Sequence, residues 1–329
     1  MRWLLGAASS LGFAVWGAVA ACEEPRVAPK PSPTAPKLVP GTQVSLVAPE
    51  GFTPAKRFAG FEATELGASI LVNVIPAPYA EMAASMTEEA MARSGMKLLE
   101  RQKLDVAGGS GLLLRAEQTA HKARYAKWLV LFGDETRTVQ LVANFPAHRI
   151  ELSEPLRTCL AGARWDRELA VDPYAHLPFT LECPPELKFF AQVQSYLLFT
   201  RTGRKRESPD DPTFTVGPSI SSPQIPDVSA FAERRLRQLP QFKVEEVLSS
   251  KSIRTARLDG WEVLAKVSDA ESGASEHVYL VVLLDAGGYY LMFGASAYAA
   301  RETYLPVFRK FTASFRLRAT PSRQPSDGK

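Results

Sequence analysis

Histidine, cysteine and serine are the residues of this chain that could carry nucleophilic or metal chemistry. The histidines occur singly, and none has the spacing to a second histidine or to a cysteine pair that a zinc site needs. Gly108–Gly111 includes Ser110 but lacks the G-x-S-x-G order of a nucleophile turn, so a hairpin turn explains it better. We therefore predict no catalytic residue, no metal and no cofactor, and expect loop or surface positions for His121, His148, His176 and His277.

Cys22 has the clearest chemical role because of the segment in front of it. Arg2 precedes an apolar run, Trp3–Ala21, which ends in small residues, and a secretory signal has this order of features. An ordinary cleavage site does not need a cysteine next, whereas a lipobox does, because its thiol accepts a diacylglycerol before cleavage. The segment Val19–Cys22 resembles the box of bacterial lipoprotein signal peptides, which implies lipidation of Cys22 and a membrane anchor.

Two alternatives to lipidation stay open, namely an uncleaved signal anchor and ordinary secretion with an incidental cysteine. A run of about 19 apolar residues can just span a bilayer. Residues 22–42 are rich in proline and poor in large apolar residues, which predicts an extended, semi-rigid stalk. Glu23 is not the aspartate that retains lipoproteins at the inner membrane of enteric bacteria, so we expect an outer-membrane anchor facing the periplasm.

Composition limits the rest of the chain. The formal net charge is +4, with 39 basic and 35 acidic residues that are mixed along the sequence. A nucleic-acid-binding protein would show a clustered basic excess, so no nucleic-acid partner is expected. No second apolar run is long enough to span a membrane, and Val278–Leu284 has the length and composition of a buried strand.

Two cysteines besides Cys22 could form a disulfide in an oxidising compartment. We expect Cys159 in a late helix of the first half and Cys183 in the first strand of the second half. A bond between them would staple the two halves together. The alternative is that each is a small buried apolar residue, as free cysteine often is.

A basic run lies at the predicted tip of a hairpin in the second half. It could contact anionic lipid or an acidic partner. A solvated tip is the simpler interpretation, because Asp210 and Asp211 follow and partly neutralise it. The basic residues are Arg201, Arg204, Lys205 and Arg206.

Aromatic residues on the predicted strands could line a ligand groove. At alternating strand positions such residues more often face the core. The candidates are Trp128, Trp261, Tyr289 and Tyr290.

The sequence repeats itself weakly. Residues 125–165 align without a gap on residues 277–317, with strand on strand, turn on turn and closing helix on closing helix. In this alignment Trp128 lies opposite Leu280, and Leu156 lies opposite Phe308. Few residues are identical, but the order of elements is the same, and we predict a duplicated domain.

Each half is expected to contain a hairpin, an amphipathic helix, three or four antiparallel strands and a closing helix. Strands in runs, with helices grouped outside them, predict an antiparallel sheet covered by helices. The hairpins are expected at Lys56–Phe61 with Ser69–Ile75 and at Ala191–Phe199 with Thr213–Ile220. The amphipathic helices are expected at Tyr79–Ser94 and Val228–Leu239.

The second half also resembles the PsbP-like and DcrB-like α/β/α sandwich superfamily. The resemblance lies in Gly260–Val263, Val278–Leu284, Tyr289–Ser296 and Phe308–Phe315, and it is weaker in the first half, where Gly111 takes the place of Gly260. It implies an α+β fold with two tandem antiparallel-sheet domains. It also implies mostly non-catalytic roles, such as extrinsic subunits, envelope lipoproteins and secretion chaperones. The matching motifs are not chemical, so they predict fold rather than function.

The predicted organisation is a signal peptide, a stalk, two α+β domains and a disordered tail. A break at Asp172-Pro173 separates the domains. The main hypothesis is a non-catalytic, lipid-anchored envelope protein that binds a protein or another envelope component. The alternatives are a hydrolase with a site between the domains and a chaperone-like holder of hydrophobic segments. The expected boundaries are 1–21, 22–42, 43–167, 176–318 and 319–329.

Overall fold

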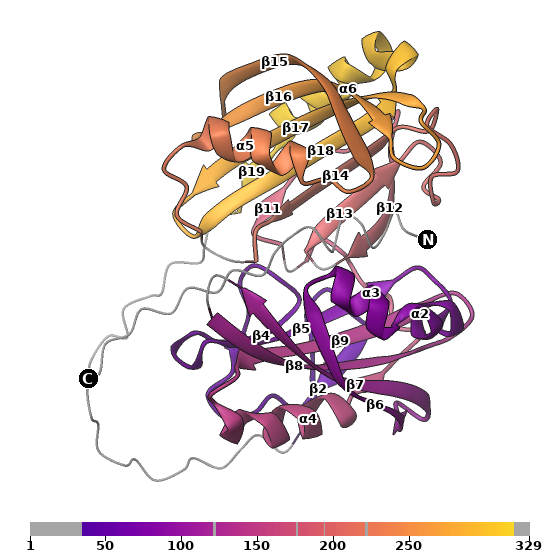
Figure 1. Cartoon of the computed structure of the whole chain (residues 1–329), viewed down its shortest axis with the longest axis vertical. Helices are drawn as coiled ribbons and strands as arrows, with labels where there is room; N and C mark the ends of the chain where they lie inside the picture. Colours follow the sequence, from indigo (N-terminus) through magenta and orange to yellow (C-terminus); the bar gives the residue numbers. More distant parts are fainter. Residues whose placement is uncertain (1–34, 121–122, 176, 194, 221–222, 319–329) are drawn as a thin grey trace.

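The first of two large sheets is built from the N-terminal half of the chain (Figure 1). The computed structural model describes residues 35–120, 123–175, 177–193, 195–220 and 223–318. The sheet is antiparallel, has seven strands and runs in the order β3-β4-β5-β9-β8-β7-β6. Its strands are β3 (Thr53–Pro54), β4 (Gly60–Ala63), β5 (Ala68–Ile75), β6 (Met96–Val106), β7 (Gly109–Ala120), β8 (Ala123–Gly133) and β9 (Thr138–Pro146).

The second large sheet repeats this topology strand for strand. It also has seven antiparallel strands, in the order β12-β13-β14-β18-β17-β16-β15. Replacing each strand by its counterpart in the first sheet gives the same order, so the predicted duplication is confirmed. The strands are β12 (Lys188–Val193), β13 (Tyr196–Thr200), β14 (Thr213–Pro218), β15 (Phe242–Thr255), β16 (Leu258–Asp269), β17 (Ser275–Asp285) and β18 (Gly288–Ala297).

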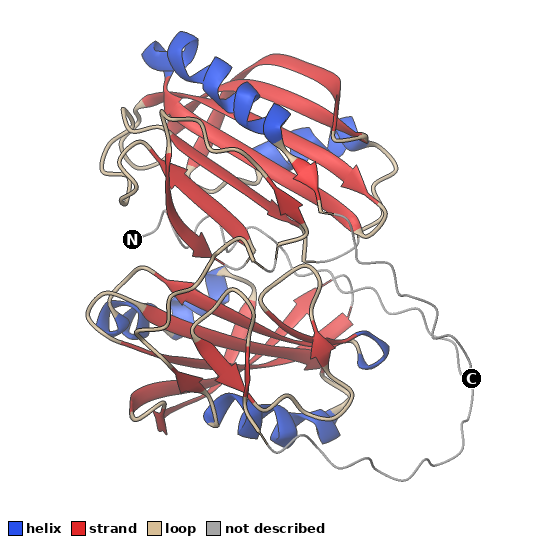
Figure 2. Cartoon of the chain, turned by 180° about the vertical axis from the view of Figure 1, so that it is seen from behind, coloured by secondary structure: helices blue, strands red, loops and turns tan. Residues whose placement is uncertain are grey.

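Helices cover both faces of each sheet (Figure 2). In the first domain α2 (Tyr79–Ser85) and α3 (Glu88–Arg93) cover one face, and α4 (Ser153–Ala161) covers the other. In the second domain α5 (Val228–Arg237) and α6 (Arg301–Ser314) do the same. The fold is therefore two tandem α/β/α sandwiches, as expected. Within the part of the chain that the structure describes, no helix is long and apolar enough to cross a membrane.

Two small sheets join the start of each domain to its end. In the first domain β2 (Val44–Leu46) pairs with β1 (Lys37–Leu38) and β10 (Arg164–Trp165), and in the second β11 (Phe179–Thr180) pairs with β19 (Arg316–Leu317). The strand after each closing helix thus returns to the strand that opens the domain. Short 3-10 turns complete the element list: η1 (Thr64–Leu66), η2 (Ile150–Leu152) and η3 (Tyr298–Ala300).

The helix predicted at Tyr79–Ser94 is two helices, α2 and α3. Helix α2 ends before Met86. The Thr87 side chain then accepts a hydrogen bond from the backbone N–H of Ala90, which caps the start of α3. From β6, the Arg101 guanidinium donates to the backbone carbonyls of Ala83 and Met86 and so satisfies the end of α2. The threonine followed by two glutamates is a helix-start signal, so the break could have been found in the sequence.

The alignment of the two halves was wrong by one residue in the central hairpin. Trp128 faces α4 and Tyr279 faces α6, which makes Tyr279 the counterpart of Trp128, in place of Leu280. Leu283 pairs with Tyr290 as Phe132 pairs with Val139. The helix alignment stands, because α4 and α6 both bury residues at the aligned positions. A shift of one residue exchanges the two faces of a strand, and these strands are apolar on both faces, so their pattern did not fix the register.

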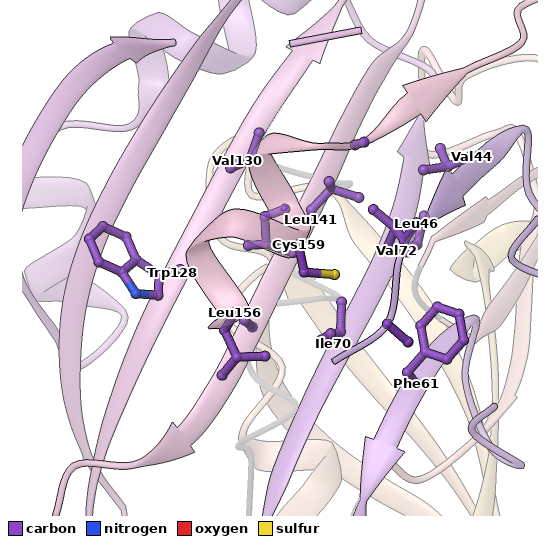
Figure 3. Close-up of a cluster of buried hydrophobic side chains, with 14 of the residues drawn as sticks. Val44, Leu46, Phe61, Ile70, Val72, Trp128, Val130, Leu141, Leu156 and Cys159 are labelled. Carbon is purple, nitrogen blue, oxygen red and sulfur yellow. The ribbon is translucent and has the colours of Figure 1, made fainter. Parts of the chain in front are cut away.

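The cores lie on the two faces of each sheet. On the α4 face of the first sheet, Leu156 and Cys159 pack against Val130, Leu141 and other strand residues (Figure 3). On the α6 face of the second sheet, Gly294 lies under the Phe308 ring, and a Cβ there would approach it to 2.6 Å. The glycine therefore lets α6 lie close to the sheet.

Cys159 and Cys183 are both free thiols, so the disulfide considered from the sequence is absent. Cys159 is enclosed in the core of the first domain, where burial raises the pKa of its thiol to about 12. Cys183 follows β11, outside any strand, and its thiol donates to the Leu187 carbonyl at 3.2 Å. No covalent bond between these two thiols joins the domains, which are held together by side-chain contacts described below.

The outer edges of the two sheets are protected against pairing with another chain. Strands β6 and β15 each form one of the two edges of their sheet, opposite β3 and β12, and each has a bulge and a run of exposed charged residues. Charged side chains and bulges are the usual means of preventing edge-to-edge association. Recognition by strand addition at these edges is therefore disfavoured.

Candidate functional site

Arg206, one of the basic residues predicted at the hairpin tip, is not free to bind a partner. Its guanidinium lies 2.6 Å from a carboxylate oxygen of Glu276 on β17, and the two side chains are 6% and 1% exposed. Burial raises the pKa of Glu276, and Arg206 opposes that shift. The pair holds the β13–β14 connection against the sheet. Arg206 is therefore not the contact residue that the sequence suggested.

The remaining basic residues of this tip differ among themselves. Arg201 pairs with Asp211, and this pair is partly exposed, as the sequence interpretation of partial neutralisation implied. Arg204 and Lys205 are exposed, and the Arg204 backbone carbonyl accepts a hydrogen bond from Thr200. Among the described residues, Arg204 and Lys205 are the basic side chains of this tip that form no ion pair, and an electrostatic contact through them stays a prediction.

His277 is the histidine that most resembles a catalytic group, but it lies inside the core. Its Nδ1 is 3.1 Å from the Ser296 hydroxyl, while its Nε2 has no hydrogen-bond partner among the described residues. The ring is fully buried beside Phe308 of α6, and burial lowers the pKa of His277 to about 4. A substrate cannot reach this pair without displacing α6. His148 is exposed, whereas His121 and His176 lie outside the described residues.

The aromatic candidates belong to the cores and do not form a groove. Trp128 donates to the Ser153 hydroxyl of α4, and Tyr290 packs edge-on against Phe315. Tyr289 faces α5, and its hydroxyl accepts a hydrogen bond from Arg235. Trp261 is partly buried on the α5 face of the second sheet.

Arg57 of the first domain makes the most extensive polar contact with the second domain. Its guanidinium donates to the carbonyls of Ser219 and Tyr289 at 2.9 and 3.1 Å and to the Asp285 carboxylate at 3.0 Å. The same group lies 5.3 Å from the centre of the Tyr290 ring. A charged, mostly buried donor with three acceptors fixes the orientation of the second domain relative to the first.

Replacing Arg57 with alanine is expected to loosen the two domains without unfolding either. Loss of the three charge-assisted hydrogen bonds should weaken domain docking by about 2–4 kcal/mol. We expect a larger radius of gyration by small-angle X-ray scattering and two resolved transitions in calorimetry. The control is Lys56→Ala at the neighbouring exposed residue. A single transition with unchanged scattering would show that Arg57 does not couple the domains.

Gln43 ties the start of the first domain to the segment between the domains. Its amide nitrogen donates to the carbonyls of Arg167 and Leu169 at 2.9 and 2.8 Å, and its amide oxygen accepts from Arg137 at 2.9 Å. The Trp165 ring contacts the guanidinium groups of both Arg137 and Arg167, at 5.3 and 4.7 Å. This network holds the start of the interdomain segment against the first domain.

A groove of about 220 Å³ lies between the two domains. Its walls come from the loop at Gly41–Gln43, from the end of β5, from the interdomain segment and from β12. Strand β12 is the edge of the second sheet and has a bulge at Phe190. The apolar lining residues are Val72, Val74, Pro76, Val171, Pro173, Phe189, Phe190 and Ala191.

The groove also has a polar element. Asn73 lines it and is 3% exposed; its amide nitrogen donates to Gln140, but its amide oxygen has no partner among the described residues. A buried acceptor without a donor is unfavourable unless another group or a water supplies one. An apolar side chain next to a hydrogen-bond donor would therefore suit this groove.

Two other hollows are less suited to a partner. One, of about 670 Å³, is wide open between the β6–β7 turn and the end of α4. The other, about 50 Å³, lies beside Arg206, and the unpartnered polar atoms of Thr213 and Gln241 belong to residues in its wall. Its lining also includes Phe190, Leu198, Phe199 and Phe293, and the space is too small for a partner's side chain.

The described surface gives no support to a chaperone-like holder of hydrophobic segments. Such a protein needs an exposed apolar patch larger than a few hundred Å². Both faces of each sheet are covered by helices, and the large hydrophobic residues exposed within the described ranges lie on four separate elements: Leu38, Leu99, Ile150 and Leu317. Those ranges also contain no cluster of three histidine, cysteine or acidic side chains able to hold a metal.

No protein-family model matches the sequence, and the curated proteins contain no match either. Several solved structures are partly similar. LpqN of Mycobacterium tuberculosis, involved in cell envelope biogenesis, is 14% identical and covers 43% of this chain and 83% of its own, with a TM-score of 0.32. PsbP of Synechocystis is 9% identical and covers 43% of this chain and 93% of its own, with a TM-score of 0.29.

A third structure spans both domains. The type VI secretion immunity protein TplEi of Pseudomonas aeruginosa is 13% identical and covers 84% of this chain and 95% of its own, with a TM-score of 0.30. The fold of this chain is defined by its own sheet order and helix packing.

Proposed function

We propose that this chain is a non-catalytic, lipid-anchored protein of the bacterial cell envelope that binds a protein partner in the groove between its domains. The lipobox at Cys22 and the proline-rich stalk support the anchor. The stalk would hold the domains away from the membrane, at the outer membrane on its periplasmic side. The observation that carries the binding role is the apolar groove with its unpartnered Asn73 oxygen, between two domains that Arg57 and Gln43 hold in place.

The groove suits recognition because its shape is set before the partner arrives. A preformed site loses less conformational freedom on binding than a flexible one. Its apolar walls and the unpartnered Asn73 oxygen favour a partner that inserts an apolar side chain and donates a hydrogen bond. Nothing in the described residues places a nucleophile and a base together at this groove.

The test is recovery of partners from the native envelope after mild cross-linking of the full lipidated protein. The wild type is expected to retain one protein partner, and Cys22→Ala is expected to leave the membrane fraction and lose it. Val171→Asp places a charge in the groove and should abolish recovery, whereas the matched control Ile150→Asp, at an exposed apolar residue, should not.

Recovery of the partner with Val171→Asp would show that binding occurs elsewhere than in the groove. Absence of any partner with the wild type would contradict the binding role. Membrane retention of Cys22→Ala would contradict the lipid anchor.

A further inference from the structure

The turn between β15 and β16 has a strained backbone. Ala256 and Arg257 are its two central residues, and both have left-handed backbones, with φ of 52° and 66°. Two-residue hairpin turns of this kind favour asparagine and glycine, because a Cβ atom disfavours positive φ. The turn ends the hairpin at the outer edge of the second sheet (Figure 1).

The equivalent turn of the first domain provides an internal comparison. Between β6 and β7 the central residues are Ala107 and Gly108, with φ of 52° and 77°. A Cβ added to Gly108 would meet nothing within 4 Å, so backbone conformation alone explains the glycine there. The second domain keeps an arginine where the same conformation favours glycine.

Contacts within the chain explain Ala256 but not Arg257. Ala256 packs against the core on the α6 face of the second sheet, together with Leu258. Arg257 is exposed, and none of the hydrogen bonds, ion pairs or aromatic contacts found within the described ranges involves it. Residues held in such sparsely populated conformations cluster at binding and switch sites, where the strain is part of the function.

The surroundings of Arg257 are basic. Arg254 is nearby on β15, and its ion pair with Asp259 is weak, at 3.4 Å with both side chains more than 70% exposed. Lys251 is also exposed on the same strand, where it shares Glu262 with Arg309. The tip thus presents a net positive charge to a partner.

We propose that Arg257 contacts an acidic surface of the protein partner, and that this contact is the reason for keeping a strained arginine at the tip. The contact lies apart from the interdomain groove and adds a chemical description of the partner. It rests on the proposed function only in requiring that a protein partner exists.

The experiment uses the full lipidated chain in its native envelope, with a photo-cross-linking residue in place of the exposed Ser252 near the tip. In this background Arg257 is changed to glycine or to lysine. Arg257→Gly should reduce the yield of the adduct with the partner at least tenfold and raise the melting temperature by about 2–4 °C. Arg257→Lys should retain the adduct without the gain in melting temperature.

The reciprocal change, Gly108→Arg in the first domain, serves as the matched control for backbone strain. It should lower the melting temperature by a similar amount. An adduct that persists with Arg257→Gly, or an unchanged melting temperature, would overturn the proposal. An adduct with lipid would overturn it in favour of membrane contact. Loss of the adduct with Val171→Asp but not with Arg257→Gly would leave the proposed function standing and refute this contact.

Discussion

Replacing Glu276 with glutamine is expected to lower the free energy of unfolding by about 3 kcal/mol, because it removes the buried carboxylate that pairs with the Arg206 guanidinium. The carboxylate and guanidinium are 2.6 Å apart and almost fully shielded from water. In such a setting an uncompensated charge costs far more than the pair contributes. The measurement is urea unfolding of the full chain, followed by fluorescence and extrapolated to zero denaturant.

Two variants show whether this loss comes from the buried charge. Asp211→Asn breaks the partly exposed pair with Arg201 on the same loop and should cost less than about 1 kcal/mol. The double variant Arg206→Met with Glu276→Leu removes both charges and should recover most of the stability lost by Glu276→Gln. If Glu276→Gln and Asp211→Asn had equal effects, Arg206 would be solvated in solution and the loop would be open.

The architecture followed from the sequence because its signals are local. The order of strands and helices and the hairpin turn at Gly108 are set by residues close to one another in the chain. Both closing helices were expected, and the repeated sheet order confirms the duplication. What the pattern did not give was the register of strands buried on both faces, since no polar face distinguishes their sides.

The candidate site was harder to predict because its parts come from distant segments. The groove is lined by residues 41–43, 72–76, 137, 171–173 and 189–192, and none of these segments has an unusual composition. Arg57 is one arginine among many, and only the fold brings it to Asp285, 228 residues later. Arg206 was singled out as a basic residue, but its burial depends on Glu276, which the sequence did not connect with it.

Lys127 breaks the apolar pattern of the first sheet. It lies on β8, on the face covered by α2 and α3, and is 2% exposed. Its ammonium donates to the side-chain oxygen of Asn144, its cross-strand neighbour, at 2.8 Å. The equivalent positions of the second domain are Val278 and Ala295, both fully buried. The fold therefore accepts apolar residues here, and the lysine is a property of the first domain alone.

Burial lowers the pKa of Lys127 from 10.5 to about 8. Because the folded-state pKa is the lower one, the unfolded chain binds more protons between these two values, and the free energy of unfolding rises with pH across that window. Below pH 8 the charged, buried lysine exerts its full cost. A shift of this size corresponds to about 3 kcal/mol.

The double variant Lys127→Met with Asn144→Ala places apolar side chains at both positions, as the second domain has. It removes the titrating lysine together with the asparagine to which it donates. The wild type should gain stability relative to this variant by about 3 kcal/mol between pH 8 and pH 10.5, measured by urea unfolding at each pH. The buried tyrosines titrate in both proteins, so their effect cancels in the difference. A difference that does not change with pH would mean that Lys127 keeps an ordinary pKa in the folded protein. A rise would show that the first domain carries a destabilising charge at neutral pH that the second domain lacks. Such a charge lowers the stability of the first domain, as is common where a residue serves function.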